Sequence, residues 1–285
     1  MRKSLLLIAL VPFFMAADLP AYKMFTGQGE SRDFDEMVKA AAKADVVLFG
    51  EFHNNPIAHW LQIELTKALH KEKKKKLVLG AEMFESDNQL ILDEYLSGTI
   101  TTSKFETEAR IWPNYKTDYK PLVEFAKDNE LVFVASNIPR RYAGVVAKDG
   151  LDALNDLSDM AKSYIAPLPV EVDSTLPNYN ALLHMGMSAH GASQNFMSAQ
   201  AIKDATMAHF IQQNRVKKGV FLHYNGAYHS NNYEGISWYL KKQDPEIKIL
   251  TISCVEQDDV TSYKKEERTL ADFVITIPTS MTKTH

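Results

Sequence analysis

Leu77-Val78-Leu79-Gly80, at residues 77–80, is an uninterrupted apolar segment, and Val132-Phe133-Val134-Ala135, at residues 132–135, is a second one. Neither segment alternates polar with apolar residues, as a strand with one face in water would. Such segments are typical of strands that are buried on both faces of a parallel sheet. Similar β-rich segments predict strands at residues 46–50, 77–84, 131–136, 219–223, 247–254 and 273–277.

Amphipathic segments separate these expected strands and predict helices. They lie at residues 34–44, 57–73, 87–97, 119–129, 139–148, 196–214 and 234–242. Strands that alternate with helices form parallel sheets with both faces covered. The sequence therefore predicts an α/β fold with a mostly parallel central sheet flanked by helices, in one domain over residues 18–285.

Residues 151–196 interrupt this alternation. The segment has no convincing strand, contains Pro167, Pro169 and Pro177, and concentrates methionine and histidine at residues 183–191. An insertion of this kind between core elements predicts a small helical lid over a pocket. The alternative is a helical cover whose methionines only fill a core.

The composition of the 285-residue chain is that of a packed globular protein. Hydrophobic residues make up 45% and charged residues 24%, which excludes a disordered or coiled-coil chain. The net charge of −4 provides no general basic field, so we expect no nucleic-acid partner. Cys254 is the single cysteine, which excludes an internal disulfide and a cysteine-cluster zinc site.

The first residues have the pattern of a secretory signal peptide. Arg2 and Lys3 precede an apolar segment at residues 5–17 that ends in two alanines. We expect cleavage after residues 1–17 and export of a soluble mature protein to the periplasm or cell envelope. No cysteine lies near the cleavage site, so a lipoprotein anchor is not expected. The alternative is a buried N-terminal strand or helix.

Acidic and imidazole side chains follow three of the expected strands. Glu51 and His53 come directly after the first strand, Glu82 and Glu85 end the second, and His229 follows the fourth. Ligands of parallel α/β sheets bind beyond the carboxyl ends of the strands. We therefore expect these side chains to converge on one edge of the sheet.

The motif G-x-x-H occurs twice after an expected strand, beginning at Gly50 and at Gly226. Glu51 and His53 alternate in an extended segment, so they point the same way and can share a ligand. Glu51, His53 and His229 are candidate ligands of a divalent metal ion. Together with Glu82 they are the candidate catalytic residues of a hydrolase that activates water.

A structural role is the alternative for the two carboxylates. Glu51 and Glu82 would then be buried acids paired with Arg110 or Arg140. The sequence has no G-x-S-x-G nucleophile motif and no glycine-rich phosphate loop, so neither a serine hydrolase of that type nor a nucleotide cofactor is favoured.

The ordered motifs resemble the ChaN-like haem-binding lipoproteins, which are related to the Tiki/TraB proteins and the erythromycin-esterase-like hydrolases. The matching segments are residues 48–59, 79–84, 119–122, 134–140, 203–208, 225–229 and 235–236. The resemblance implies an α/β domain with a small helical subdomain that binds haem, often as a homodimer with stacked haems. It also implies export, a part in haem and iron acquisition, and an outer-membrane haem-uptake partner. The lipoprotein cysteine is absent from this sequence.

The expected lid supplies the candidate haem ligands. We prefer Tyr179 with His184 nearby, and the alternatives are Tyr164, Met185 and His190. Phenolate, imidazole and thioether groups all ligate haem iron in proteins. No C-x-x-C-H motif occurs, which excludes covalent c-type haem attachment.

Three functional hypotheses follow from these residues. We favour an exported haem-binding protein that stores or hands over haem, rather than an enzyme. The alternative is an exported metal-dependent hydrolase of peptide or ester bonds that uses the two G-x-x-H segments. The third hypothesis is a catalytically silent interaction module of the cell envelope.

Overall fold

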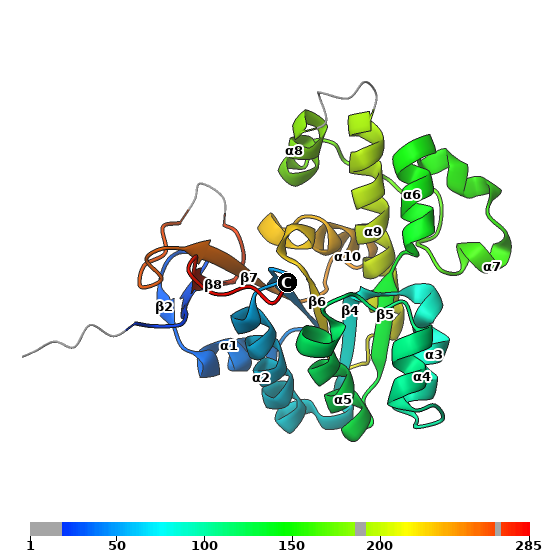
Figure 1. Cartoon of the computed structure of the whole chain (residues 1–285). Helices are drawn as coiled ribbons and strands as arrows, with labels where there is room; N and C mark the ends of the chain where they lie inside the picture. The colour runs from blue at the N-terminus through cyan, green and yellow to red at the C-terminus, as the bar shows by residue number, and fades with distance from the viewer. Residues whose placement is uncertain (1–18, 186–191, 266–268) are drawn as a thin grey trace, which may run out of the picture.

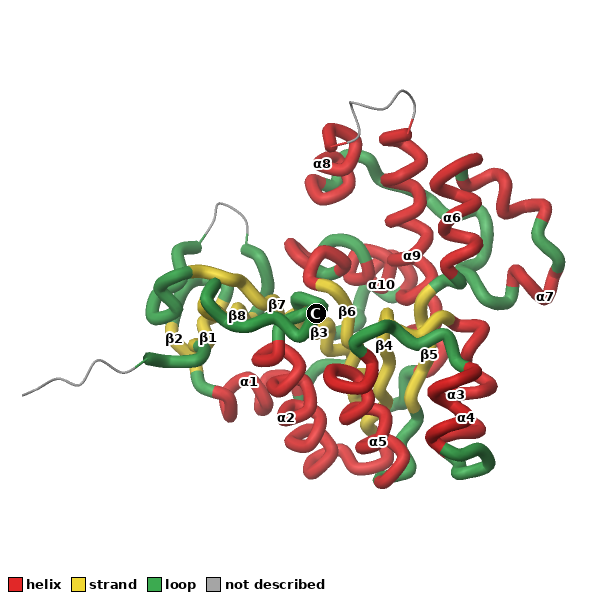
Figure 2. The backbone as a smooth tube through the Cα atoms, viewed as in Figure 1, coloured by secondary structure: helices red, strands yellow, loops and turns green. Residues whose placement is uncertain are grey.

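A mixed eight-stranded sheet forms the centre of the computed structural model, which describes residues 19–185, 192–265 and 269–285. The strand order is β2-β1-β8-β7-β3-β6-β4-β5 (Figures 1 and 2). All pairings among the six strands β3, β4, β5, β6, β7 and β8 are parallel. In contrast, β1 pairs antiparallel with β2 and β8. The strands are β1 (Lys23–Thr26), β2 (Ser31–Arg32), β3 (Val46–Glu51), β4 (Leu77–Glu85), β5 (Phe133–Asn137), β6 (Val220–Gly226), β7 (Ile249–Gln257) and β8 (Phe273–Pro278).

The predicted α/β fold with a mostly parallel central sheet is confirmed, and each of the expected strands is present within a few residues of its expected bounds. β1 and β2 were not predicted. They have 4 and 2 residues, too few for a pattern to show. β1 pairs with β8, a partner about 250 residues away in the chain, and β2 pairs with β1.

Helices cover both faces of the sheet (Figures 1 and 2). Alternate residues of β3 show this division, because Val47 and Phe49 belong to one apolar core and Val46 and Leu48 to the other. The first core contains α1 (Phe34–Ala41), α2 (Pro56–Lys73), α3 (Gln89–Leu96), α4 (Thr102–Glu108) and α5 (Lys120–Asp128). The second contains α6 (Arg140–Asp149), α8 (Pro177–Met185), α9 (Ala192–Asn214) and α10 (Ile236–Gln243).

The segment expected to form a lid, residues 151–196, contains short helices and a non-helical stretch at residues 163–176. It contains a 3-10 helix (Leu151–Asp156), α7 (Asp159–Lys162), α8 and the first residues of α9. α8 packs beside α9 on the face that carries α6 and α10 (Figure 1). The bounds and the gating role of the lid stay predictions.

The turn from β3 into α2 has a well-defined local cause. Asn55 caps the helix, since its side-chain oxygen accepts hydrogen bonds from the backbone N–H groups of Ile57 (3.0 Å) and Ala58 (3.3 Å). Pro56, which follows, occupies the first turn, where the missing N–H costs nothing. This cap fixes the turn that carries His53.

Within the described ranges, we find no helix with the length and apolar character that a bilayer span requires.

Candidate functional site

The carboxyl ends of β3, β4 and β6 bring together the acids and imidazoles expected there. Glu51 ends β3, Glu82 lies near the end of β4, and His229 lies in the turn after β6. The backbone N–H of Gly226 donates a hydrogen bond of 2.7 Å to Glu82, which ties β6 to β4 at this edge. The expected convergence of Glu51, His53, Glu82 and His229 is therefore present in the structure.

Glu51 is the buried centre of one hydrogen-bonded cluster, the Glu51 cluster (Glu51, His53, His59, Gln62 and Tyr119). Its carboxylate accepts from His53 Nδ1 (2.9 Å), from the Tyr119 hydroxyl (2.7 Å) and from the Gln62 amide. Burial opposes ionisation of Glu51, but hydrogen bonds from His53 and His59 outweigh it and hold the pKa of the carboxyl below its ordinary value. Glu51 is thus an anion held by donors on three sides.

His59 is a member of this network that the sequence did not reveal. The side chain is buried, with Nδ1 3.3 Å from Glu51 and Nε2 3.3 Å from Asp118. Burial disfavours its charged form, yet Glu51 and Asp118 raise the pKa of His59 above its ordinary value. Its place one turn into α2 explains this, because the first turn of that helix faces the end of β3.

Glu82 forms a second buried cluster, the Glu82 cluster (Glu82, His229, Asp204 and Tyr179). His229 lies between two carboxylates, with Nε2 3.2 Å from Glu82 and Nδ1 hydrogen-bonded to Asp204. Burial disfavours the imidazolium, but the charges of Glu82 and Asp204 raise the pKa of His229 to about 10. Burial likewise opposes ionisation of Glu82, but His229, His53 and the Gly226 N–H hold the pKa of Glu82 well below its ordinary value.

Asp204 was missed by sequence reasoning, although it lies within the segment 203–208 that carries the family resemblance. It is buried on α9, where burial raises the pKa of its carboxyl. No sequence pattern around a single aspartate in a helix shows that its partner is a histidine from another element. The pairing is visible only in three dimensions.

His53, a member of the Glu51 cluster, lies on the side of that cluster that faces Glu82. It is the most exposed of the three histidines in the two clusters. Its side chain is 37% exposed, and its ring packs edge-on against Trp112, with the ring centroids 4.9 Å apart. Burial disfavours the charged form of His53, but the hydrogen bond to Glu51 and the charge of Glu82 raise the pKa of His53 above its ordinary value. The imidazole can therefore give a proton to a group that enters from solvent.

The structural alternative for these acids named the wrong partners. Arg110 pairs with Glu85 (3.1 Å) and Asp87 rather than with Glu51 or Glu82, and Arg140 makes no ion pair within the described part of the chain. Imidazole, phenol and amide groups form hydrogen bonds with Glu51 instead. Among residues 19–185, 192–265 and 269–285, no group of three or more His, Cys, Asp or Glu side chains is placed to hold a metal ion.

The candidate haem ligands of the lid occupy different environments. Tyr179 is buried, its hydroxyl donates a 2.6 Å hydrogen bond to Asp204, and burial raises its pKa well above the ordinary value. Tyr164 is partly exposed, and its backbone carbonyl accepts from Ser86 (2.7 Å). The side chains of His184 and Met185, and all of His190, lie outside the described residues.

A cleft opens beside the Glu82 cluster, between α6, α9 and the loop at residues 110–113. It consists of two adjoining cavities of about 440 and 590 Å³ that share Glu85, Trp112 and Arg140 in their walls. Both volumes fall within the range of small-molecule sites, about 300–1,000 Å³. We call this the α6–α9 cleft. Glu82 is part of its wall, so the buried cluster borders the cleft.

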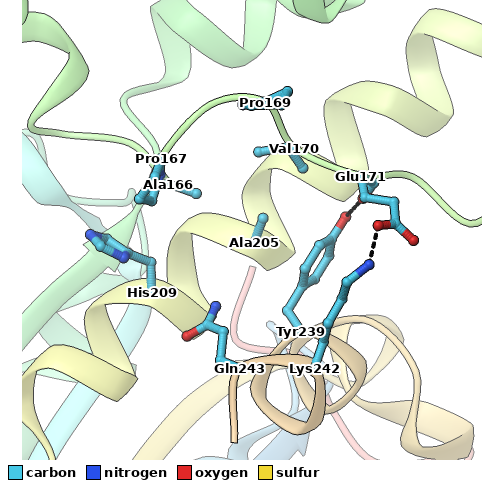
Figure 3. Close-up of a pocket in the computed structure, with 10 residues that line it drawn as sticks. All are labelled: Ala166, Pro167, Pro169, Val170, Glu171, Ala205, His209, Tyr239, Lys242 and Gln243. Carbon is cyan, nitrogen blue, oxygen red and sulfur yellow. Dashed lines mark hydrogen bonds and ion pairs between the residues drawn. The ribbon is translucent and has the colours of Figure 1, made fainter.

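A separate pocket of about 340 Å³ lies between residues 166–171, α9 and α10 (Figure 3). Its charged side chains are already paired. Lys242 forms an ion pair with Glu171, and the Tyr239 hydroxyl donates to the Glu171 carbonyl at 2.7 Å. The remaining wall is largely apolar, with Pro167, Pro169 and Val170 on one side.

Solved structures share this fold. The structure described as cofacial haem binding to ChaN of Campylobacter jejuni is 18% identical, with a TM-score of 0.65 over 89% of this chain and 96% of that one. A succinoglycan biosynthesis protein is 12% identical, with a TM-score of 0.52 over 87% of this chain and 92% of that one. At these identities the likeness concerns the fold.

Sequence comparison adds one curated relative and a family. The chloroplastic protein RETICULATA-RELATED 5 of Arabidopsis thaliana is 24% identical over 204 residues, which are 67% of this chain. The chain spans only 27% of the length of that relative. The family described as "Haem-binding uptake, Tiki superfamily, ChaN" matches residues 37–240, a range that holds both clusters and the α6–α9 cleft. The resemblance inferred from the ordered motifs is confirmed: this chain belongs to the ChaN haem-binding uptake family of the Tiki superfamily.

Proposed function

We propose that this protein binds haem as a cargo and hands it on during haem and iron acquisition. The observation that carries the proposal is the family match over residues 37–240, which covers the strand ends and the cleft beside them. Haem is an apolar macrocycle with two propionate carboxylates. A site for it needs an apolar slot with a few polar anchors at its rim.

The described residues fit such a cargo. The α6–α9 cleft has the volume of a small-molecule site, with Trp112, Ile138 and Phe196 as apolar walls. Arg140 and Lys203 provide positive charge, so these residues would bind the macrocycle and its carboxylates. Bound haem would supply an iron centre that takes an axial ligand.

The axial ligand stays a prediction. Tyr179 and His184 are the preferred pair, with Tyr164, Met185 and His190 as alternatives. Because the Tyr179 hydroxyl donates to Asp204 at 2.6 Å, its use as a ligand requires that this hydrogen bond be broken.

The proposal extends to the cell envelope. Arg2, Lys3 and the apolar residues 5–17 support export through a signal peptide. We further propose a homodimer that receives haem from an outer-membrane uptake partner, on the basis of the family alone.

A haemin titration of the purified chain, followed in the Soret region, tests haem binding. We expect saturable, stoichiometric binding, and a changed spectrum in Tyr179→Phe or His184→Ala identifies the ligand. Tyr95→Phe is the matched control, because it removes a hydroxyl bonded to Glu124 and Thr102, which belong to neither cluster and do not line the cleft. Weak uptake that never saturates would overturn the proposal.

Hydrolysis is the second candidate function, and the closeness of the acids Glu51 and Glu82 to the imidazoles of His53 and His229 at one edge of the sheet favours it. Glu51 and Glu82 would orient the imidazoles of His53 and His229, the attacking water would lose its proton to solvent, and His53 would give a proton to the leaving group as the ester or amide bond breaks. Assays with ester and peptide substrates, with and without a chelator, test this function. Turnover that is lost in both His53→Ala and His229→Ala supports hydrolysis, and turnover unchanged in both rejects it.

A further inference from the structure

Lys203 and Arg140 are cations without a partner in the described part of the chain, and both line the α6–α9 cleft. Lys203 is half-buried on α9, and no hydrogen bond or ion pair of its ammonium group is found there. Its neighbour Asp204 points away from it, toward His229 and Tyr179. An ammonium group in the wall of a cleft, with no acid bound to it, can bind an anion that enters the cleft.

Arg140 stands apart from the two other arginines of the cleft. Arg110 binds Glu85 and Asp87, and Arg141 binds Asp87 at 2.5 Å. These two guanidinium groups are engaged in holding the loop against the sheet. Arg140, the first residue of α6, keeps its donors free for a ligand, and a guanidinium binds a carboxylate through two hydrogen bonds.

Besides the cations, Glu82, Glu85 and Asn137 form the polar part of the cleft wall, and the rest of the wall is apolar. Phe196 is 56% exposed although it is a large aromatic residue, and Trp112 lines both cavities. On α6 the facing residue is Gly144, and a Cβ placed there would meet no atom within 4 Å. A flat apolar group can therefore lie along α6 without displacing protein atoms.

We propose that Arg140 and Lys203 bind the two carboxylates of a flat apolar dicarboxylate, whose ring system lies against Trp112, Phe196 and the Gly144 surface of α6. The proposal deepens the proposed function and rests on it, because it assigns haem to this cleft and its propionates to these two cations. The pocket of Figure 3 does not offer the same chemistry, since Lys242 there is already neutralised by Glu171.

The test compares haemin with its dimethyl ester, in which both carboxylates are masked. We expect the double variant Arg140→Gln/Lys203→Gln to weaken haemin binding at least tenfold in the Kd. The ester should bind the unchanged chain and the double variant equally. The matched control, Lys148→Gln/Lys217→Gln, removes the same charge from α6 and the turn after α9 and should leave the haemin Kd unchanged.

A second variant tests the apolar wall without touching charge. Gly144→Leu fills the open space on α6, so we expect haemin and its ester to lose affinity alike, at least tenfold, with an unchanged melting temperature. Saturable haemin binding that neither Gly144→Leu nor the double variant weakens would overturn the cleft assignment and leave haem binding intact. Absence of saturable binding to the unchanged chain would instead overturn haem binding itself, and the cleft assignment with it.

Discussion

His223 lies in β6 and His229 in the turn after it, yet near neutral pH the first imidazole is neutral and the second is a cation. Burial lowers the pKa of His223 to about 4, and its ring contacts neutral groups, Ser136 at 2.8 Å and Asn225 at 3.2 Å. Burial acts in the same direction on His229, but two carboxylates raise its pKa to about 10. Neighbouring charge, more than depth, decides which buried imidazole is a cation.

The first prediction concerns His229→Gln, which leaves Glu82 and Asp204 buried without their cation. We expect a loss of roughly 3–5 kcal/mol in the free energy of unfolding near pH 6.5, as for other broken buried ion pairs. The folded pKa of about 10 lies above the ordinary 6.5, so the imidazolium stabilises the fold fully below pH 6.5. That contribution disappears as the pH rises toward 10.

Urea unfolding at several pH values between 6.5 and 10 measures this effect. The difference between the unchanged chain and His229→Gln should shrink steadily across that window. His209→Gln is the control: burial lowers the pKa of His209, so its protonation changes only below 6.5. A difference for His229→Gln that stays constant up to pH 10 would contradict the assigned charge.

At the scale of elements, the end of β6 is shaped by its closeness to the loop after β3. A Cβ at Gly226 would lie 2.8 Å from His53 Nε2 and 3.5 Å from a Glu82 oxygen. Gly50, at the end of β3, is similarly close, because a Cβ there would lie 2.9 Å from the Cα of Ala227. The two G-x-x-H motifs thus place a glycine at each strand end where neighbouring atoms leave no room for a Cβ.

The second prediction compares the crowded Gly226 with Gly144, which has open space around it. Gly226→Ala should displace His53 and lower the free energy of unfolding by about 1–3 kcal/mol, the usual cost of overpacking. Gly144→Ala is the matched control, because its Cβ meets open space. Alanine is the better helix former by up to about 1 kcal/mol, so that variant should be unchanged or more stable. Equal destabilisation of both variants in urea unfolding would refute this account.

For the whole molecule, the two apolar cores share one set of strands. Alternate residues of β3 enter opposite cores, so neither core can be lost while the parallel sheet stays buried on both faces. Trp112 packs against the first core and Trp238 against the second. Each core therefore has its own fluorescent reporter.

The third prediction is that both cores unfold together. Variants that keep only Trp112 or only Trp238, with the other tryptophans changed to Phe, should show coincident urea midpoints that also match far-UV circular dichroism. Separate midpoints would show that the two faces of the sheet unfold independently. Trp60, which is 49% exposed on α2, can be replaced in both variants with little effect on stability.

The sequence by itself determined the central strands, the flanking helices, the family and the edge where Glu51, Glu82 and His229 meet. Apolar continuity and the position of a residue after a strand are local properties, and parallel pairing brings strand ends to one edge. The family motifs could also be found in order along the chain, without any knowledge of contacts.

Only the tertiary structure decided which groups neutralise these acids. Tyr119 reaches Glu51 from 68 residues away, and Asp204 meets His229 across 25 residues, whereas the arginines expected as partners bind other acids or none in the described chain. The short strand β1, which pairs with β8, and the α6–α9 cleft also depend on distant segments. Hydrogen-bond partners and cavities arise from packing between elements, and a pattern within one element carries no information about that packing.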